Sequence, residues 1–215
     1  MADRSGRRSG FSLTWLLLTE LVVLVLLVPV PRIIQAMDIE RAMTWKMMGD
    51  ATSSWMINYS DDLYRSTFID TGVREAVFDH VVPTREERAR SRGLQNLGTG
   101  WWFPYLETRL TASFLVLRHL VFRIVSACTW VPFFVAIAIP AAMDAMMMWR
   151  KRNYEWEYAS PMVHRWGEKT LKNIPVLFAL VLFAPAPLPP LTHVGLAVVG
   201  ALGIHMIGKH LPRMI

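Results

Sequence analysis

Long apolar runs constrain the fold of this chain more than any other sequence feature. Phe11 to Val30 is apolar over about 20 residues, enough for a helix to cross ~30 Å of hydrocarbon. Further apolar runs cover residues 124–148, 173–184 and 192–208. With 53% hydrophobic residues and a mean hydropathy of +0.30, the chain is too apolar for an ordinary soluble domain. The sequence predicts an all-α membrane protein with four transmembrane helices.

The net charge of +6 first suggests nucleic acid as a partner, but its distribution argues otherwise. The basic residues lie beside the apolar runs, where membrane topology places them. We therefore expect anionic lipid rather than direct nucleic-acid binding to use these charges. The single cysteine, Cys128, lies inside an apolar run, which excludes a disulfide framework and CxxC-type metal sites.

The N-terminal part divides into residues 1–31, a cytoplasmic N-terminus with the first span, and residues 32–110, a polar insert. An uncleaved span is favoured over a signal peptide because the apolar run is long and Ile34-Gln35-Ala36 is a poor cleavage site. The insert has ten Lys or Arg and eleven Asp or Glu. Long loops translocate regardless of such charges, so we predict a helical periplasmic insert. Asp38 and Ser60 are positioned to cap two of its helices.

The C-terminal part is predicted to form three further spans. Residues 111–149 are read as one long helix with its transmembrane part near 124–148, kinked at Pro132 and Pro140. Residues 150–172 form a cytoplasmic segment, and residues 173–215 a transmembrane hairpin with a short tail, turning at a proline-rich stretch. The Lys and Arg bias of the loops places both termini on the cytoplasmic side of the membrane.

The cytoplasmic segment mixes basic and aromatic residues, which is typical of a membrane-surface anchor. It is equally suited to docking a partner, because arginine and aromatic residues are enriched at interface hot spots. The sequence leaves the two interpretations about even. The candidate contact residues are Arg150, Arg152, Trp156, Tyr158, His164, Arg165, Trp166 and Lys169.

Three charged residues stand in or beside the apolar runs. Glu20 lies near the middle of the first span, where a lone carboxylate is costly and marks a candidate functional site; a hydrogen-bonded helix contact is the plainer alternative. Arg118 and Arg123 could pair with Glu20, or reach lipid head groups at the interface.

The last span carries a face of small residues at Ala197, Gly200 and Ala201 that allows close helix packing.

The sequence predicts no enzyme. Asp144, Ser160 and His164 invite a triad interpretation, but Ser160 precedes a proline and lacks a glycine elbow. No GxxxxGK[ST] loop and no metal-ligand spacing occurs, so we expect neither cofactor nor metal.

The layout of the whole chain resembles a family of inner-membrane proteins from integrating conjugative elements and conjugative plasmids, filed as domain of unknown function 4400. The shared pattern places an aspartate at the end of a span, then a basic run, a serine and a histidine. The matching positions are Asp144, Arg150, Arg152, Ser160, His164 and Lys169. The resemblance implies a conjugative-transfer role near the type IV coupling protein and implies no enzymatic activity.

Together these observations predict a non-enzymatic inner-membrane subunit of a conjugative type IV secretion system, associated with the coupling ATPase or the inner-membrane complex. It could also form a homo-oligomer. The alternative is a small oligomeric channel or transporter subunit that uses Glu20, Arg118 and Arg123.

Overall fold

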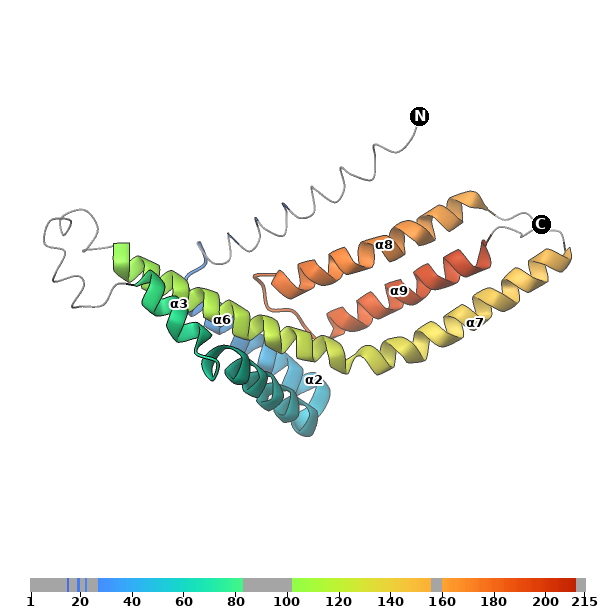
Figure 1. Ribbon diagram of the computed structural model, residues 1–215. Helices are drawn as coiled ribbons and strands as arrows, with labels where there is room; N and C mark the ends of the chain where they lie inside the picture. The colour runs from blue at the N-terminus through green and yellow to red at the C-terminus, as the bar shows by residue number, and fades with distance from the viewer. Residues whose placement is uncertain are drawn as a thin grey trace, which may run out of the picture. The chain divides into compact units, whose positions relative to one another are not determined.

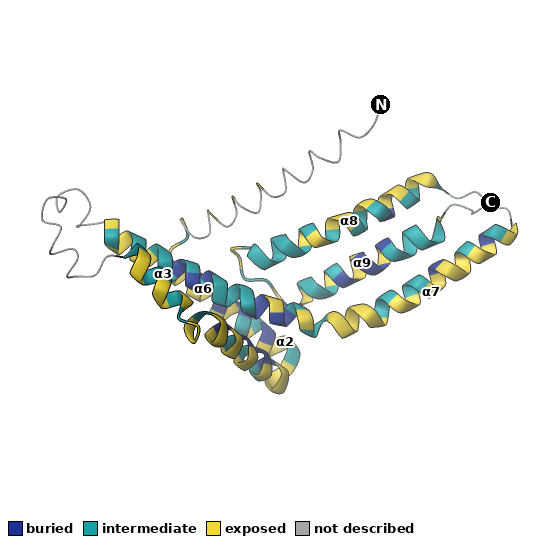
Figure 2. Ribbon diagram, in the orientation of Figure 1, coloured by how far each residue is buried: buried dark blue, intermediate teal, exposed yellow. Residues whose placement is uncertain are grey.

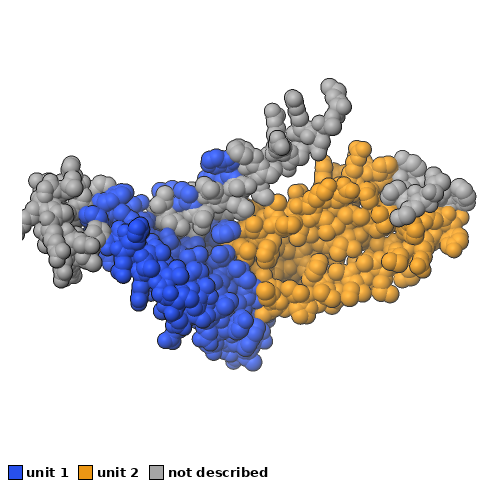
Figure 3. All heavy atoms as spheres, viewed as in Figure 1, with its two compact units in different colours: residues 1–125, 183–187 blue, residues 126–182, 188–215 orange. Residues whose placement is uncertain are grey.

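The computed structural model describes residues 15, 19, 22, 27–82, 102–155 and 160–211. Within these residues the chain is helical and contains no strand, which confirms the all-α prediction for them (Figure 1). They form two compact units (Figure 3): unit 1 contains residues up to Val125 together with Phe183–Pro187, and unit 2 contains Ser126–Leu182 and Leu188 onward. Glu20, Trp156 and Tyr158 lie outside the described residues, as does most of the predicted first span.

Unit 1 is built on a helical hairpin, α2 (Val30–Tyr64). The chain bends at Gly49, whose φ of 77° and ψ of 171° are outside the helical region and suit glycine. Two contacts join the arms on either side of this bend: Ser53 Oγ donates to the Thr44 carbonyl at 3.1 Å, and Arg41 lies 3.1 Å from Asp61. The two arms therefore run antiparallel, as Figure 1 shows.

The start of this hairpin differs from the sequence prediction. Asp38 and Ser60 lie inside α2 rather than at helix starts, and Ser60 Oγ bonds the Ile57 carbonyl of its own helix. The helix begins instead after Pro29, with Pro31 in its first turn. Proline is tolerated there because an N–H in the first turn of a helix would have no helical partner.

The hairpin packs against α6 (Trp102–Thr129). Within each arm of the hairpin the buried positions recur every three or four residues, which is the spacing of one helix face. The apolar core at this contact joins Ile33 and Met37 of α2 to Ala112 and Val116 of α6. After α2 the chain continues through a π-helical segment, η1 (Arg65–Ile69), into the short helix α3 (Val73–Val81).

The predicted long helix 111–149 is two helices in the structure. α6 ends at Thr129 and α7 (Val131–Glu155) follows after Trp130. Pro132 explains the break, because it can neither donate a helical hydrogen bond nor allow its preceding residue an easy α conformation. Pro140 is accommodated inside α7.

Unit 2 consists of the last residues of α6 with α7, α8 (Pro161–Phe183) and α9 (Leu191–Lys209). The proline-rich turn predicted from the sequence separates α8 from α9. A Cβ on Gly200 would lie 3.1 Å from Phe134 of α7 and 3.2 Å from Ile174 of α8. Gly208, further along α9, would bring a Cβ to 2.7 Å from Ala145, further along α7. Both helices advance in the same direction between these two contacts, so α9 runs parallel to α7.

Among the residues that the structure describes, three helices are long and apolar enough to cross a membrane: α6, α7 and α9. They support a membrane protein, and the four-span arrangement stays a prediction. Only 6% of the most apolar stretch of α7 is buried within the protein, against 39% of that of α6 (Figure 2). α8, which contains the predicted third span, is not among the three because its first half is polar.

Candidate functional site

A buried ion cluster joins α2 and α6 in unit 1. Arg123 donates to both carboxylate oxygens of Glu40, with its Nη2 2.8 Å from Oε2. His119 Nε2 lies 3.2 Å from the same oxygen. The side chains of Glu40 and Arg123 are 6% and 2% exposed. A carboxylate and a guanidinium this deeply buried are stable only as a hydrogen-bonded pair.

Arg123 also anchors the turn between α8 and α9. Its Nη1 donates to the Ala184 carbonyl at 2.7 Å and its Nη2 to the Ala186 carbonyl at 2.8 Å. These turn residues belong to unit 1. A single buried side chain therefore connects the α2 hairpin to the proline-rich turn, and its positive charge is balanced by Glu40.

The ionisation of Glu40 follows from these contacts. Burial alone would raise the pKa of this carboxyl group, but the hydrogen bonds and charges of His119 and Arg123 outweigh it. The result is a pKa lowered from 4.5 to about 2. Glu40 is therefore ionised at any physiological pH.

A second ion cluster lies nearer the surface of unit 1. Arg118 donates to both oxygens of Asp61, at 2.9 Å and 2.7 Å, and Arg41 approaches the same carboxylate at 3.1 Å. Burial raises the pKa of Asp61, but its arginine partners reverse this and leave it lowered. Arg118 and Arg123 are thus paired with Asp61 and Glu40, whereas the sequence suggested Glu20 or lipid head groups.

Sequence reasoning missed Glu40 as a site residue, although the signal was present. Ile33, Met37, Glu40 and Thr44 are spaced by four, three and four residues, so they share one helix face. An acidic residue on an otherwise buried face requires a cation on the opposing helix.

The end of unit 2 formed by the end of α7, the start of α8 and the end of α9 is basic. The contacts of Gly208 with Ala145 and of Gly167 with Ile207 bring these three helix ends together. We call this region the basic end. Its exposed basic and aromatic residues are Arg150, Lys151, Tyr154, Arg165, Trp166 and Lys169, and Lys209 is partly exposed. The exposed Glu155 lies 3.8 Å from Lys151 and offsets part of this charge. Tyr154 is 84% and Trp166 60% exposed, so aromatic surface stands among the charges.

Arg152 has a different environment from its basic neighbours. It is 5% exposed and donates to the carbonyls of Lys209 and Leu211. Carbonyl groups at the C-terminal end of a helix have no helical N–H as a partner, so Arg152 supplies the missing donor. It also lies 3.5 Å from His210 Nδ1. Burial, followed by the charges of Arg152 and Lys209, lowers the pKa of His210. Arg152 was predicted to contact a partner or lipid, but it is buried and caps the C-terminal end of α9.

The three residues of the triad interpretation have separate partners. Asp144 lies 3.3 Å from His205, and His164 lies 3.4 Å from Glu168 one turn along its own helix. The backbone N–H of Ser160 donates to His210 Nδ1.

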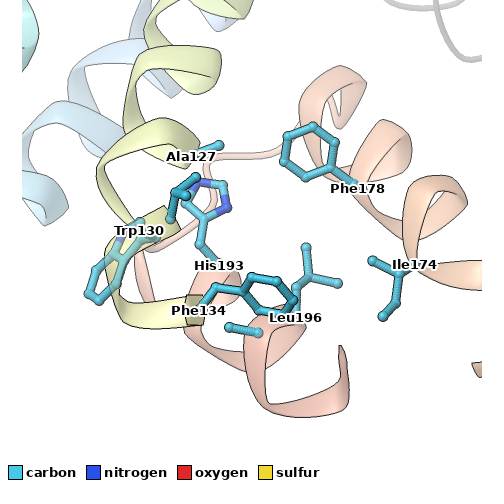
Figure 4. A pocket seen from close by; sticks show the side chains of 9 residues that line it. Ala127, Trp130, Phe134, Ile174, Phe178, His193 and Leu196 are labelled. Carbon is cyan, nitrogen blue, oxygen red and sulfur yellow. The ribbon is translucent and has the colours of Figure 1, made fainter. Parts of the chain in front are cut away.

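The small-residue face of α9 lies inside unit 2. Ala197, Gly200 and Ala201 are buried there, and Gly200 packs closely against Phe134 of α7 and Ile174 of α8. Beside Ala197 an open apolar groove of about 220 Å³ is lined by the aromatic rings of Trp130, Phe134 and Phe178 and by His193 (Figure 4). Among the residues that the structure describes, no group of three potential ligands could hold a metal ion.

Comparison with known proteins gives one family match. A family model for DtrJ-like proteins, described as IncC plasmid conjugative DNA transfer protein DtrJ-like, matches residues 33–208. No curated protein and no solved structure matches the chain.

Proposed function

The chain belongs to the DtrJ-like family of conjugative DNA transfer proteins, and on that premise we propose that it is a non-enzymatic inner-membrane subunit of a type IV secretion system. In this role it holds a basic docking surface at the cytoplasmic side for the coupling ATPase or another inner-membrane component. The family membership agrees with the conjugative-element resemblance found in the sequence. The observation that carries the proposal further is the basic end of unit 2.

The exposed apolar surface of unit 2 supports membrane insertion. α7 leaves almost all of its most apolar stretch exposed, including Phe133, Ile139 and Met146. Exposed apolar surface on this scale is unfavourable in water and suits lipid. In our proposal α7 and α9 cross the bilayer, and the apolar second half of α8 crosses it between them.

α6 has a different role in the proposal, although its length and composition would permit a span. Its apolar residues Ala112 and Val116 already pack against α2, and Arg118 and Arg123 form ion pairs there. α2 carries many charged residues and is costly to place in hydrocarbon. Most of α6 therefore serves as the core of a periplasmic helical insert.

The basic end supports protein docking because its charges are available on the surface. Arg150, Arg165 and Lys169 are exposed, and Arg165 and Lys169 lie within one turn of the 60% exposed Trp166 on α8. Arginine combined with aromatic rings is the composition of interface hot spots. The same residues would also attract anionic lipid, each by about 1 kcal/mol.

Docking is tested by measuring conjugation and co-purification in a Trp166→Ala, Arg165→Ala variant. The control is Trp55→Ala, which removes a similarly exposed tryptophan (53%) from unit 1. We expect transfer frequency and recovery of transfer proteins to fall at least about tenfold in the double variant, as for loss of one hot spot. Equal membrane levels and unchanged transfer in the double variant would reject the docking surface.

Topology is tested by thiol labelling of intact cells in a Cys128→Ser background. Single cysteines replace Asp70 in the insert, Glu155 at the end of α7 and Leu188 in the proline-rich turn. We expect an impermeant reagent to label positions 70 and 188 but not 155. Protection of position 70 would exclude the periplasmic insert.

We do not favour the alternative of a channel or transporter subunit. It requires Arg118 and Arg123 to face an ion path, whereas both hold carboxylates within unit 1. Glu20→Gln remains its direct test: unchanged DNA transfer in this variant excludes an ion path through Glu20.

A further inference from the structure

Unit 1 contains a cavity of about 430 Å³, lined by both charged and apolar residues, that the proposed function does not use. Its walls come from α2, η1, α3 and α6. The charged and hydroxyl-bearing residues that line it are Asp61, Asp62, Tyr64, Arg65, Arg74, Thr111 and Arg118.

The charges of this cavity do not all cancel. Asp61 is already paired with both Arg41 and Arg118. Arg65 is 71% exposed on its side chain and lies 3.7 Å from Asp70. The cavity lining contains three arginines and two aspartates, Asp61 and Asp62, so its formal charge is +1. Arg74 has no ion pair with a carboxylate of the described residues, and it is the cation of the lining that is left for an anion.

Aromatic rings hold the Arg74 side chain in place. Its guanidinium carbon is 5.6 Å from the ring centroid of Phe78 and 6.0 Å from that of Phe114. Both separations are within the range of cation–π attraction. Because the side chain is already ordered, binding an anion there costs little additional conformational entropy.

The Tyr64 hydroxyl provides a neutral hydrogen-bond donor in the same cavity. Burial raises the pKa of Tyr64, although the charges of Arg74 and Arg118 act in the opposite direction. The phenol therefore keeps its proton at neutral pH and can donate it in a hydrogen bond to an anion.

The backbone beside the cavity is irregular. The π-helical turn of η1 follows Tyr64 directly, and α3 begins after Gly72, whose φ of 72° suits glycine. π-helical turns occur frequently at functional sites. Here the turn leads the chain back so that Arg74 of α3 lines the same cavity as Tyr64 of α2.

We propose that this cavity binds a phosphate group, with the Arg74 guanidinium as its main cation and the Tyr64 hydroxyl as a further donor. Phosphate matches the fork of an arginine and offers more acceptor oxygens than a carboxylate. The volume leaves room for an ester substituent. The phosphate can come from a phospholipid head group or from free phosphate.

The test uses the full chain in a neutral detergent and isothermal titration at constant ionic strength. One arm titrates inorganic phosphate, and the other titrates dihexanoyl phosphatidylglycerol below its micelle concentration. We expect saturable binding that weakens at least about tenfold in Arg74→Gln, the effect of losing one charge-assisted hydrogen bond. Arg32→Gln, an exposed arginine of unit 1 away from the cavity, should bind as the unchanged protein does.

The two arms identify the source of the phosphate. Tighter binding of the phosphatidylglycerol than of inorganic phosphate assigns a lipid head group, and equal or weaker binding assigns free phosphate. If circular dichroism shows that Arg74→Gln is unfolded, Tyr64→Phe decides: weaker binding supports the site, and unchanged binding rejects it. Absence of saturable binding in both arms, or equal binding by Arg74→Gln and Arg32→Gln, overturns the proposal.

Discussion

The buried pair of Glu40 and Arg123 gives the most direct test of how unit 1 is held together. Glu40→Gln preserves the size of the side chain and removes the charge that balances a guanidinium of 2% exposure. Removing one partner of a buried ion pair costs about 3–5 kcal/mol. The lowering of the Glu40 pKa from 4.5 to about 2 independently corresponds to about 3 kcal/mol, since each pKa unit is worth about 1.4 kcal/mol. We expect unit 1 to lose about 3 kcal/mol at pH 7.

This contribution also depends on pH in a defined direction. The folded state binds the Glu40 proton less tightly than the unfolded state does, so the stabilisation is present above pH 4.5. It is lost as the pH falls from 4.5 towards about 2. The difference in stability between Glu40→Gln and the unchanged protein should therefore shrink across this range.

Hydrogen exchange of the full chain in detergent measures the effect within unit 1. A loss of about 3 kcal/mol speeds exchange of the most protected α2 amides roughly a hundredfold. Asp38→Asn is the matched control, because Asp38 is an exposed carboxylate on the same arm of α2. Equal exchange in the two variants would show that the Glu40 charge does not stabilise unit 1 and would refute the reasoning.

Two further predictions concern unit 2. Gly208→Ala should destabilise it by about 1–3 kcal/mol, because the added Cβ would lie 2.7 Å from that of Ala145. The control Gly195→Ala, whose added Cβ would meet nothing within 4 Å, should be neutral or stabilising. Equal melting temperatures for the two variants would contradict the close packing of α9 on α7. Arg152→Ala should raise the pKa of His210 towards its ordinary value and speed exchange at the end of α9, both measurable by NMR. An unchanged His210 titration would argue against that contact.

Local sequence signals predicted the helical class and the break between α8 and α9. The apolar runs and the prolines between residues 184 and 190 act through the backbone within one or two turns, so they could be interpreted without a fold. Pro132 was predicted only to kink one long helix, whereas the structure has two separate helices, α6 and α7, on either side of Trp130. Helix starts were less predictable. Asp38 can cap a helix in principle, but the prolines at positions 29 and 31 start α2 earlier and leave Asp38 inside it.

The sequence by itself determined that this chain forms helices, that several of them are apolar enough to cross a membrane, and that the segment before the last two apolar runs is basic. Periodicity and charge bias are local properties, so they can be interpreted without the fold. The tertiary structure alone decided which charges meet. Glu40 and Arg123 are separated by 83 residues, and no spacing rule relates them. The same holds for Arg152. Its sequence context is like that of the exposed Arg150, but the fold buries it against the end of α9. Ion pairs between helices depend on which faces pack together, and that is a property of the folded chain.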